Sequence, residues 1–456
     1  MRTALTVLDA TVIPVSSDPT APQWWRGWMT VGHDGRITAM GEGHPPRVEG
    51  DVLDVGGAFV APGFVSAHSH LYTSGMRGVA HSESLYPWVR ANNEILVRAE
   101  ARDMYWATVH GSLDFLGNGI TSAFNFTQSR VIVMFDGQTG TGTAARVHDP
   151  GFVHAQVEGA ADAGLRVVHA FRLDDDWFDE DVATGTFAQM VHGAAERTPG
   201  PQHLGSAVMG SVQWAASART AELEVRAMRE HGVLNQAHFV ETAEGIELQR
   251  TKFDWYDRAG ALGPGFWFGH FVHPTGPMVD RVAQTGAGVV WQATSNGRLG
   301  SGLADVIGYR KAGIPVAMGL DDQSCTDVSD PFQNMRMGLY AVRAAHRDAG
   351  VMTPADVLRL HTLESAAAIG AADRVGSLEV GKLADFVVVD PRRPDTGPRH
   401  DVVATYVLAC SLRNLKSVHV GGRQVADADG PRGDLAVRAS HELHTSAVWN
   451  PVAAMV

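Results

Sequence analysis

Two histidines stand one residue apart at the end of an apolar run, in Ala67-His68-Ser69-His70-Leu71. If this run is a strand, its side chains alternate, so His68 and His70 project to the same face about 6.6 Å apart. Neighbouring imidazoles on one face can chelate a divalent cation. A His-x-His pair alone is equally compatible with two ordinary polar residues at a strand end. Its interpretation therefore depends on what stands at the ends of the other strands.

Imidazoles and carboxylates also mark the ends of three further apolar runs, where the candidates are His238, Glu241, His270, His273, Asp321 and Asp322. Three histidines and one aspartate make a ligand set that suits Zn²⁺, Fe²⁺ or Mn²⁺ and leaves a position open for water. Such a cation lowers the pKa of a coordinated water from 15.7 towards about 7, which provides hydroxide at neutral pH. The residues thus predict a metal-dependent hydrolytic site, provided that the fold brings these strand ends together.

The elements that must position these side chains are βα units. Between residues 63 and 375, short apolar runs alternate with longer helical patterns, which is typical of a parallel sheet. Eight runs qualify as strands: Phe64–His70, Ile120–Phe126, Leu165–Arg172, Ala207–Gln213, Val233–Glu241, Phe266–Val272, Gly288–Ser295 and Ile314–Asp322. Eight strands predict a (β/α)8 barrel, in which active sites lie at the C-terminal ends of the strands. An open doubly wound sheet is the alternative, but it normally uses fewer strands.

A different texture at both chain ends predicts a second, smaller domain. Short β-rich runs occur there at Met29–Val31, Arg36–Met40, Ala384–Val389 and Ser417–Val425. The first two flank the turn-forming His33-Asp34-Gly35, which is a hairpin signal. We therefore predict a (β/α)8 TIM-type barrel over residues 63–375. A small β-sandwich domain is expected to combine residues 1–62 with residues 376–456, which also include a tail.

Composition limits the classes of function. With 37 Lys and Arg against 50 Asp and Glu, the formal net charge is −13, so the chain is a poor candidate for binding nucleic acid or an anionic membrane surface. Its two cysteines, Cys325 and Cys410, exclude a disulfide framework and a Cys-rich zinc site. No apolar run approaches the ~18–20 residues that span a bilayer, and an acid at Asp9 precedes any signal-peptide core. We expect a cytoplasmic protein.

One segment resembles a dinucleotide-binding fingerprint. The apolar run Val131–Phe135 is followed by a G-x-G-x-x-A pattern over residues 140–145. The helix that this fingerprint needs is interrupted at Pro150-Gly151. We therefore expect a loop over the barrel mouth, where loops often gate substrates.

Three longer strings resemble the amidohydrolase superfamily. They are Ala61–His70, which is similar to its opening strand, Ser295–Gly302, similar to the loop of its seventh strand, and Val375–Asp385, similar to its return into the β-domain. Within this superfamily the chain resembles the mononuclear aminohydrolases, which include adenosylhomocysteine, guanine and cytosine deaminases and the triazine hydrolases. No lysine stands at the fourth strand, where the chain reads Ser211-Val212-Gln213. That absence argues against the dinuclear branch, which carries a carbamylated lysine.

This resemblance implies a role for each polar residue of the site. It makes one divalent ion the cofactor, with Zn²⁺ favoured over Fe²⁺ or Mn²⁺, and it makes its ligands His68, His70, His238 and Asp321. The catalytic residues implied are Asp321, His270 and Glu241. Asp321 and His270 would orient the hydroxide and take its proton. Glu241 would protonate a ring nitrogen of the substrate and then the leaving amine, help that is typically worth ~10²–10⁴ in rate.

Six further residues are expected near the substrate: Trp88, Gln128, Arg172, His273, Asn296 and Asp322. Arg172 ends the third strand, where relatives often place a substrate-contacting arginine. Asp322 stands where relatives usually have glycine. Trp291 and Gln236 each replace a histidine that is frequent in relatives. These departures leave the roles of Asp322, Trp291 and Gln236, and the identity of the substrate, open.

We predict a metal-dependent aminohydrolase, or deaminase, that acts on a small nitrogen-containing molecule. It would use an activated water to displace ammonia or a small amine from an sp² carbon of a nitrogen heterocycle. The same site could instead open a cyclic amide or amidine ring, or expel chloride as triazine hydrolases do. A metal-stabilised binding protein is the non-enzymatic alternative, but a structural metal needs neither Glu241 nor His270. The resemblance also implies a homodimer or a higher homo-oligomer.

Overall fold

The structure is a computed structural model that describes residues 3–137, 139–394 and 396–450. Its packing divides the chain into two compact units. The first comprises Met1–Ala67, Leu113–Ser122 and Ser329–Gly433, and the second comprises His68–Ser112, Ala123–Val328 and Asp434–Val456. The domain boundaries expected at residues 62/63 and 375/376 stay predictions.

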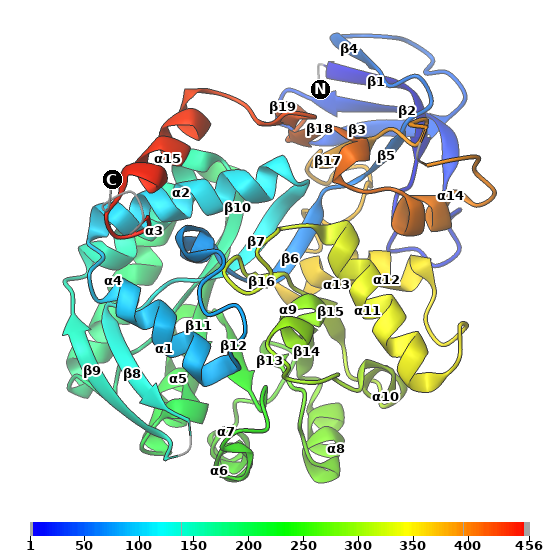
Figure 1. The fold of residues 1–456 in the computed structure, drawn as a ribbon. Helices are drawn as coiled ribbons and strands as arrows, with labels where there is room; N and C mark the ends of the chain where they lie inside the picture. The colour runs from blue at the N-terminus through cyan, green and yellow to red at the C-terminus, as the bar shows by residue number, and fades with distance from the viewer. Residues whose placement is uncertain (1–2, 138, 395, 451–456) are drawn as a thin grey trace. The chain divides into compact units, whose positions relative to one another are not determined.

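A nine-stranded sheet forms the barrel, in the order β15-β14-β13-β12-β11-β10-β7-β6-β16 (Figure 1). In chain order its strands are β6 (Phe64–His70), β7 (Ile120–Phe126), β10 (Arg166–Phe171), β11 (His203–Gly210), β12 (Leu234–Phe239), β13 (Phe266–His270), β14 (Gly288–Trp291), β15 (Val316–Met318) and β16 (Asp321–Asp322). All seven residues of β7 and all six of β10 are buried. Burial on both faces is what a parallel sheet covered by helices requires.

This sheet closes on itself. Its two ends, β15 and β16, are halves of one strand that are separated only by Gly319 and Leu320. β15 pairs with β14, whereas β16 pairs with β6 and places Asp321 opposite Ser69. Glycine is needed at position 319 because a Cβ there would lie 2.6 Å from Cβ of His68. The predicted (β/α)8 barrel is confirmed, with β15 and β16 together as the eighth strand.

Five predicted strands end earlier than expected, and two of them end three or more residues early. The strand expected over Ala207–Gln213 runs from His203 to Gly210, because the next N–H, that of Ser211, donates to the carboxylate of Glu224 instead of to a neighbouring strand. The strand expected over Gly288–Ser295 ends at Trp291, since helix α9 begins two residues later and its first turn is closed by Asn296 N–H and Gln292 C=O.

Helices connect the barrel strands and continue beyond the last of them. They are α1 (Leu85–Leu96), α2 (Ala101–Gly117), α3 (Gly151–Ala163), α4 (Glu180–Arg197), α5 (Arg219–His231), α6 (Ile246–Thr251), α7 (Phe253–Ala259), α8 (Gly276–Thr285), α9 (Ala293–Arg298), α10 (Val306–Lys311), α11 (Pro331–His346), α12 (Pro354–Leu360), α13 (Leu363–Ala368), α14 (Val402–Ala404) and α15 (Asp434–Thr445). Shorter turns are η1 (Leu71–Met76), η2 (Gly200–Gln202), η3 (Val212–Trp214), η4 (Thr405–Ala409) and η5 (Leu412–Asn414). No helix in these described ranges is long and apolar enough to cross a bilayer.

Apolar faces of three of these helices cover part of the barrel. Val157 of α3, Phe187 of α4 and Leu223 of α5 pack into one buried cluster. The same cluster contains Phe171 of β10 and Val208 of β11. Burial of these apolar side chains stabilises the helices against the sheet. It also holds in place the strands whose ends carry the polar residues.

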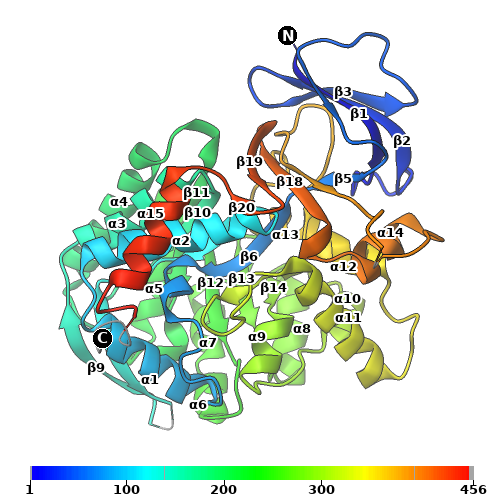
Figure 2. The ribbon, with the colours of Figure 1, turned by 45° about the horizontal axis from the view of Figure 1, so that its top comes forward.

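The second sheet joins strands from both chain ends, in the order β20-β19-β18-β17-β5-β1-β2-β3, with β4 paired to β1. Its strands are β1 (Thr3–Val12), β2 (Trp25–Gly32), β3 (Ile37–Glu42), β4 (Asp51–Asp54), β5 (Phe59–Pro62), β17 (Phe386–Val389), β18 (Leu415–Val420), β19 (Arg423–Asp427) and β20 (Gly430–Pro431). The predicted hairpin is confirmed by antiparallel β2 and β3, with Met29 opposite Met40. Figure 2 shows the blue N-terminal strands and the orange C-terminal strands of this sheet. A second sheet built from both ends is therefore present, as predicted.

Two further features belong to the second compact unit. Strands β8 (Val131–Asp136) and β9 (Thr141–Val147) form an antiparallel hairpin, so the prediction of a loop in this segment is wrong. The β-branched residues of this segment favour strands, whereas the prediction used only the pattern of glycines. Helix α15 lies beside α2 in both views (Figures 1 and 2), where Arg102 Nη2 is 3.0 Å from Glu442 Oε2.

Candidate active site

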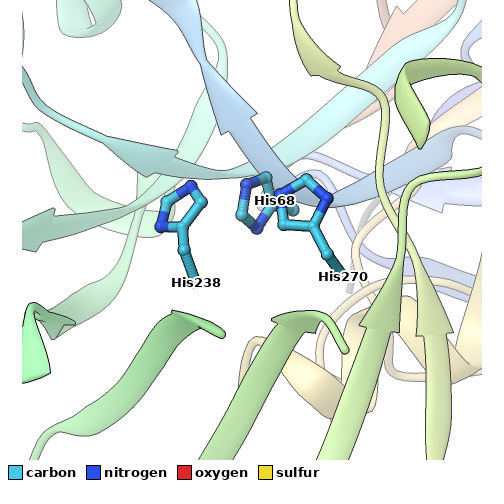
Figure 3. Close-up of side chains that lie close together, drawn as sticks. All are labelled: His68, His238 and His270. Atoms are coloured by element: carbon cyan, nitrogen blue, oxygen red, sulfur yellow. The ribbon is translucent and has the colours of Figure 1, made fainter. Parts of the chain in front are cut away.

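The four predicted metal ligands lie together at the C-terminal ends of β6, β12 and β16. Nε2 of His70 is 3.4 Å from Nε2 of His68 and 3.2 Å from Nε2 of His238. Oδ1 of Asp321 is 3.3 Å from Nε2 of His68 and 3.6 Å from Nε2 of His70. Figure 3 shows the rings of His68, His238 and His270 directed into one space. Residues up to about 250 positions apart in the sequence thus share one site.

The tautomer of His68 and the protonation state of His70 are those that a divalent cation needs. Oε1 of Gln236 lies 2.6 Å from Nδ1 of His68. An amide oxygen only accepts, so Nδ1 carries the proton and Nε2 presents a lone pair to the site. Burial lowers the pKa of His70 to about 3, which keeps this imidazole neutral. Converging neutral nitrogens beside a carboxylate repel one another unless a cation lies among them, so the residues fit a divalent ion.

His270 is held in one orientation by two amides. Its backbone N–H donates to Oε1 of Gln292 at 2.9 Å, and Nδ2 of Asn296 lies 2.9 Å from its Nδ1. Because the amide nitrogen donates, Nδ1 accepts and the ring proton resides on Nε2. Nε2 is 3.4 Å from Oε2 of Glu241 and 3.7 Å from Oδ2 of Asp321. His270 therefore presents a hydrogen-bond donor to the two carboxyl groups of the site.

Glu241 and Asp321 are both buried but have opposite pKa shifts. Burial, and then the charge of Asp321, raises the pKa of Glu241 well above its usual range. Burial alone would raise the pKa of Asp321 as well, but the surrounding imidazoles outweigh this effect and hold it well below its usual range. Oε1 of Glu241 has no hydrogen-bond partner among the described residues. One carboxyl group thus favours its protonated form and the other its ionised form, an arrangement suited to acid–base chemistry.

The backbone is strained where these side chains leave the barrel. Val240, His270, Phe271 and Asp321 have φ values of 48°, 67°, 47° and 68°. This left-handed region is unfavourable for residues with a Cβ, above all for a β-branched valine. Such strain persists where the surroundings impose it and is concentrated at functional sites.

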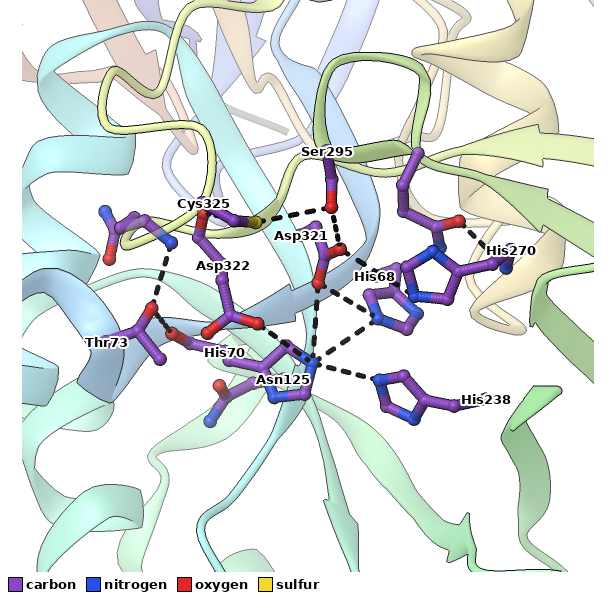
Figure 4. A network of polar contacts seen from close by, with 12 residues as sticks. His68, His70, Thr73, Asn125, His238, His270, Ser295, Asp321, Asp322 and Cys325 are labelled. Carbon is purple, nitrogen blue, oxygen red and sulfur yellow. Dashed lines mark hydrogen bonds and ion pairs between the residues drawn. The ribbon is translucent and has the colours of Figure 1, made fainter. Parts of the chain in front are cut away.

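A hydrogen bond from Ser295 fixes the carboxylate of Asp321, the first of two aspartates at the end of the eighth strand (Figure 4). Oγ of Ser295 donates to Oδ2 of Asp321 at 2.6 Å, and Sγ of Cys325 lies 3.3 Å from the same Oγ. Oδ2 of Asp322 lies 3.8 Å from Nε2 of His70. Burial, and then the charge of Asp321, raises the pKa of Asp322 well above its usual range. Asp322 therefore adds a second carboxyl group next to the metal ligands.

A cavity of about 480 Å³ adjoins this cluster, which is a size typical of small-molecule sites. Its polar lining includes His70, His238, Glu241, His270, Asp321 and Asp322. Its apolar lining includes Met76, Leu85, Trp88, Val89, Leu96, Val131, Val133, Phe135, Trp177, Met209, Trp214 and Leu299. The β8–β9 hairpin contributes part of this wall, so the segment expected to be a loop over the barrel mouth does face the site.

Four of the six residues expected near the substrate line this cavity: Trp88, Gln128, Arg172 and Asp322. Nε1 of Trp88 donates to the carbonyl of Ser324 at 3.3 Å, and Oε1 of Gln128 accepts from the hydroxyl of Tyr72 at 2.9 Å. Contact of these four with a substrate stays a prediction.

The other two residues lie outside the cavity lining. Nε2 of His273 lies 2.7 Å from the carbonyl oxygen of Ser301. Asn296 is buried and directed at the ring of His270. The structure thus gives both residues protein partners and places neither where a substrate enters.

The sequence did not predict the residues that hold the polar side chains of the site, namely Gln236, Gln292 and Ser295. Gln236 precedes His238 by two residues on the same strand face, and this alternation could have suggested that it points towards the metal ligands. No sequence signal indicates that Gln292 holds His270 or that Ser295 holds Asp321. Trp291 is fully buried in β14, so it belongs to the barrel wall.

A closed parallel barrel with imidazoles and a carboxylate at its C-terminal strand ends is the architecture of a metal-dependent TIM-barrel hydrolase. Residues 59–425 match the model of the amidohydrolase family. The chain belongs to the amidohydrolase family, as the resemblance predicted.

Named relatives agree with this assignment. The 5-methylthioadenosine/S-adenosylhomocysteine deaminase of Symbiobacterium thermophilum is 28% identical over 440 residues, which covers 92% of this chain and 93% of that protein. The zinc-bound adenosine deaminase from Xanthomonas campestris superposes over 99% of both chains with a TM-score of 0.82 at 20% identity. Atrazine chlorohydrolase from Arthrobacter aurescens, complexed with zinc, covers 98% of this chain and all of its own, with a TM-score of 0.80 at 20% identity. These two structural likenesses establish the fold.

Proposed function

We propose that this protein is a metal-dependent aminohydrolase that displaces ammonia or a small amine from an sp² carbon of a nitrogen heterocycle. One observation carries the proposal: Glu241 and His270 stand beside the converging imidazoles of the site and the carboxylate of Asp321, and both line the same cavity as His70, His238 and Asp321. The deaminase names of its relatives support this reaction class. The expected homo-oligomeric state and cytoplasmic location stay predictions.

We further propose that His68, His70, His238 and Asp321 hold one Zn²⁺ ion. Ligand atoms of His68, His70 and Asp321 lie within 4.8 Å of one another, as do those of His68, His238 and His270. Imidazoles with a single carboxylate are a usual ligand set for zinc, and two structural neighbours carry zinc. When bound, the ion supplies a Lewis acid that lowers the pKa of a water molecule.

The chain's own residues then handle the protons. Asp321, held by Ser295, accepts a proton from the attacking water, and Nε2–H of His270 orients that water. Glu241, whose Oε1 is unengaged, donates its proton to a ring nitrogen, takes a second proton from the new hydroxyl group on the attacked carbon and delivers it to the leaving nitrogen. Asp321 then returns its proton to Glu241, which restores both residues. A carbon–oxygen bond forms, the exocyclic carbon–nitrogen bond breaks, and the amine leaves with a proton that came from water. Acid–base help of this kind is typically worth about 10²–10⁴ in rate.

A product-mass screen tests the proposal. Zinc-loaded protein is incubated with amino-purines, amino-pyrimidines, amino-triazines and cyclic amides, and Glu241→Gln protein serves as the blank. We expect NH₂ to be exchanged for OH, with ammonia or an amine released in equal amount. Products that gain one water and lose nothing would assign the site to ring opening instead. Zinc bound without turnover of any compound would favour a binding protein.

A further inference from the structure

Arg172 is the one lysine or arginine among the described residues that line the cavity. Its charge is already engaged, because Nη2 lies 3.3 Å from Oδ2 of Asp176 and Nε lies 3.6 Å from Oδ1 of Asp174. The side chains of Arg172, Asp174 and Asp176 are only 13%, 7% and 15% exposed. The guanidinium therefore faces two largely buried carboxylates, and solvent screens these pairs little.

Both carboxylates are anchored from behind. Oγ of Ser129 lies 2.7 Å and 2.8 Å from the two carboxylate oxygens of Asp174. Oδ1 of Asp176 accepts the backbone N–H of Ala216 at 3.2 Å, which leaves Oδ2 for Arg172. Releasing the guanidinium to a ligand would take from both largely buried carboxylates the cation that they face at close range, which is unfavourable.

The rest of the described cavity lining contains no second lysine or arginine. It does contain four further carboxyl groups, those of Asp176, Glu241, Asp321 and Asp322. Much of its remaining wall is apolar, including the indoles of Trp177 and Trp214. Away from the proposed zinc, a carboxylate or phosphate on a ring substituent would lose its hydration without gaining an unpaired cation, and beside Arg172 it would lie near Asp176.

We propose that this cavity selects substrates whose ring substituent is apolar and uncharged, and that Asp176 is a specificity-determining residue because it occupies Arg172. Heterocycles that carry a carboxylate or a phosphate are rejected. This inference rests on the proposed aminohydrolase function and deepens it, since it names the class of substituent. It also reassigns Arg172, which sequence analysis placed in contact with the substrate, to an internal ion pair.

Matched substrate pairs test this selectivity. 5′-Methylthioadenosine and S-adenosylhomocysteine share the aminated ring and the thioether and differ in a methyl group against a charged amino acid. A second pair is an amino-triazine with an N-butyl or an N-(3-carboxypropyl) chain. We expect kcat/KM to be at least about 100-fold higher for the member without a carboxylate in whichever pair reacts, since a carboxylate buried without an unpaired cation loses its hydration.

Asp176→Asn is the informative variant. Asparagine keeps an oxygen for the N–H of Ala216 but removes the charge that holds Arg172. We expect the selectivity ratio to fall about tenfold, chiefly through a lower KM for the carboxylate-bearing member. The matched control is Asp179→Asn, which removes the same charge from an exposed residue outside the cavity lining, and its ratio should remain that of the unmodified protein.

Calorimetric binding of the same pairs to Glu241→Gln protein separates this inference from the proposed function. If no compound releases ammonia or an amine, the proposed function fails, and tighter binding of the uncharged members would still support the selectivity. The proposed selectivity would be overturned if the carboxylate-bearing members bind or react as well as the uncharged members, or better. Absence of binding by every uncharged member would also overturn it, as would an Asp176→Asn ratio that matches the Asp179→Asn control.

Discussion

Oε1 of Gln236 lies 2.6 Å from Nδ1 of His68, and both side chains are buried. The amide oxygen can only accept, so it fixes the tautomer of His68 and directs its Nε2 lone pair at Asp321 and the other imidazoles. Gln236 thus lies behind a proposed metal ligand, where partners of this kind are known to tune metal affinity. The glutamine that replaces a frequent histidine in this position has a physical role.

We expect Gln236→Ala to weaken zinc affinity about 10–100-fold, because His68 loses the acceptor that sets its tautomer. Competition with a chromophoric chelator measures the change. Gln236→Glu keeps an acceptor oxygen and is the matched control, so its affinity should stay closer to that of the unmodified protein. Equal affinity in Gln236→Ala would show that the hydrogen bond does not control the metal site.

Glu241→Gln should retain zinc and lose turnover by about 10²–10⁴, since an amide cannot carry the proton to the leaving group. Metal content is measured by elemental analysis and turnover by ammonia release. Asp321→Asn is the contrasting variant, because it should weaken zinc binding and turnover together. Loss of zinc from Glu241→Gln in proportion to activity would instead make Glu241 a structural support.

Asp322→Asn should raise KM by about tenfold with a smaller change in kcat, because Asp322 lines the cavity and the amide of asparagine presents a different pattern of donors and acceptors to a substrate. Its zinc content should remain unchanged, since Oδ2 of Asp322 lies 3.8 Å from Nε2 of His70 and is not one of the proposed ligands. Steady-state kinetics measures KM and kcat of the variant, and elemental analysis measures its zinc content. A variant that loses zinc while KM stays constant would place Asp322 in the metal site.

Glu224 should make the protein less stable above neutral pH. It accepts hydrogen bonds from Ser211 N–H and from Nδ2 of Asn235, but burial raises its pKa from 4.5 to about 7. A raised pKa means that the folded state binds the proton more tightly. Its stabilising contribution is therefore complete below about pH 4.5 and is lost as the pH rises through about 7. The loss amounts to at most about 3 kcal/mol, at 1.36 kcal/mol for each pKa unit.

Urea unfolding of the zinc-saturated protein between pH 5 and pH 9 measures this dependence, and Glu224→Gln is the comparison. The free energy of unfolding of the variant should vary less with pH over this range, because glutamine does not titrate. Parallel pH profiles for the two proteins would show that another group controls stability.

Removal of the metal should lower the melting temperature. A ligand that binds only the folded state stabilises it by about 2.7 kcal/mol at 100 times its dissociation constant. Scanning calorimetry in chelator and then in increasing zinc should show a progressive rise. Asp321→Asn is the control, with a smaller response to the same zinc concentrations. An unmodified protein that melts at one temperature throughout would contradict a zinc site in the folded barrel.

Much of the framework could be predicted from the sequence, because local patterns carry it. Apolar runs that alternate with helical patterns identified the barrel strands, since strands covered on both faces must be apolar throughout. His68 and His70 stand on one strand face by alternation alone. The ends of other strands likewise placed His238 and Asp321 correctly, because every parallel strand of a barrel ends at the same rim.

Tertiary structure alone decided what surrounds these residues. Gln236 and His68 are 168 residues apart, so their contact exists only because the sheet closes and brings β12 near β6. Arg172 illustrates the same limit, since its position at a strand end suggested a substrate contact, whereas the fold pairs it with Asp174 and Asp176. The role of a charged side chain depends on which oppositely charged group lies within a few ångströms of it. That distance depends on how loops fold over the barrel and not on spacing along the chain.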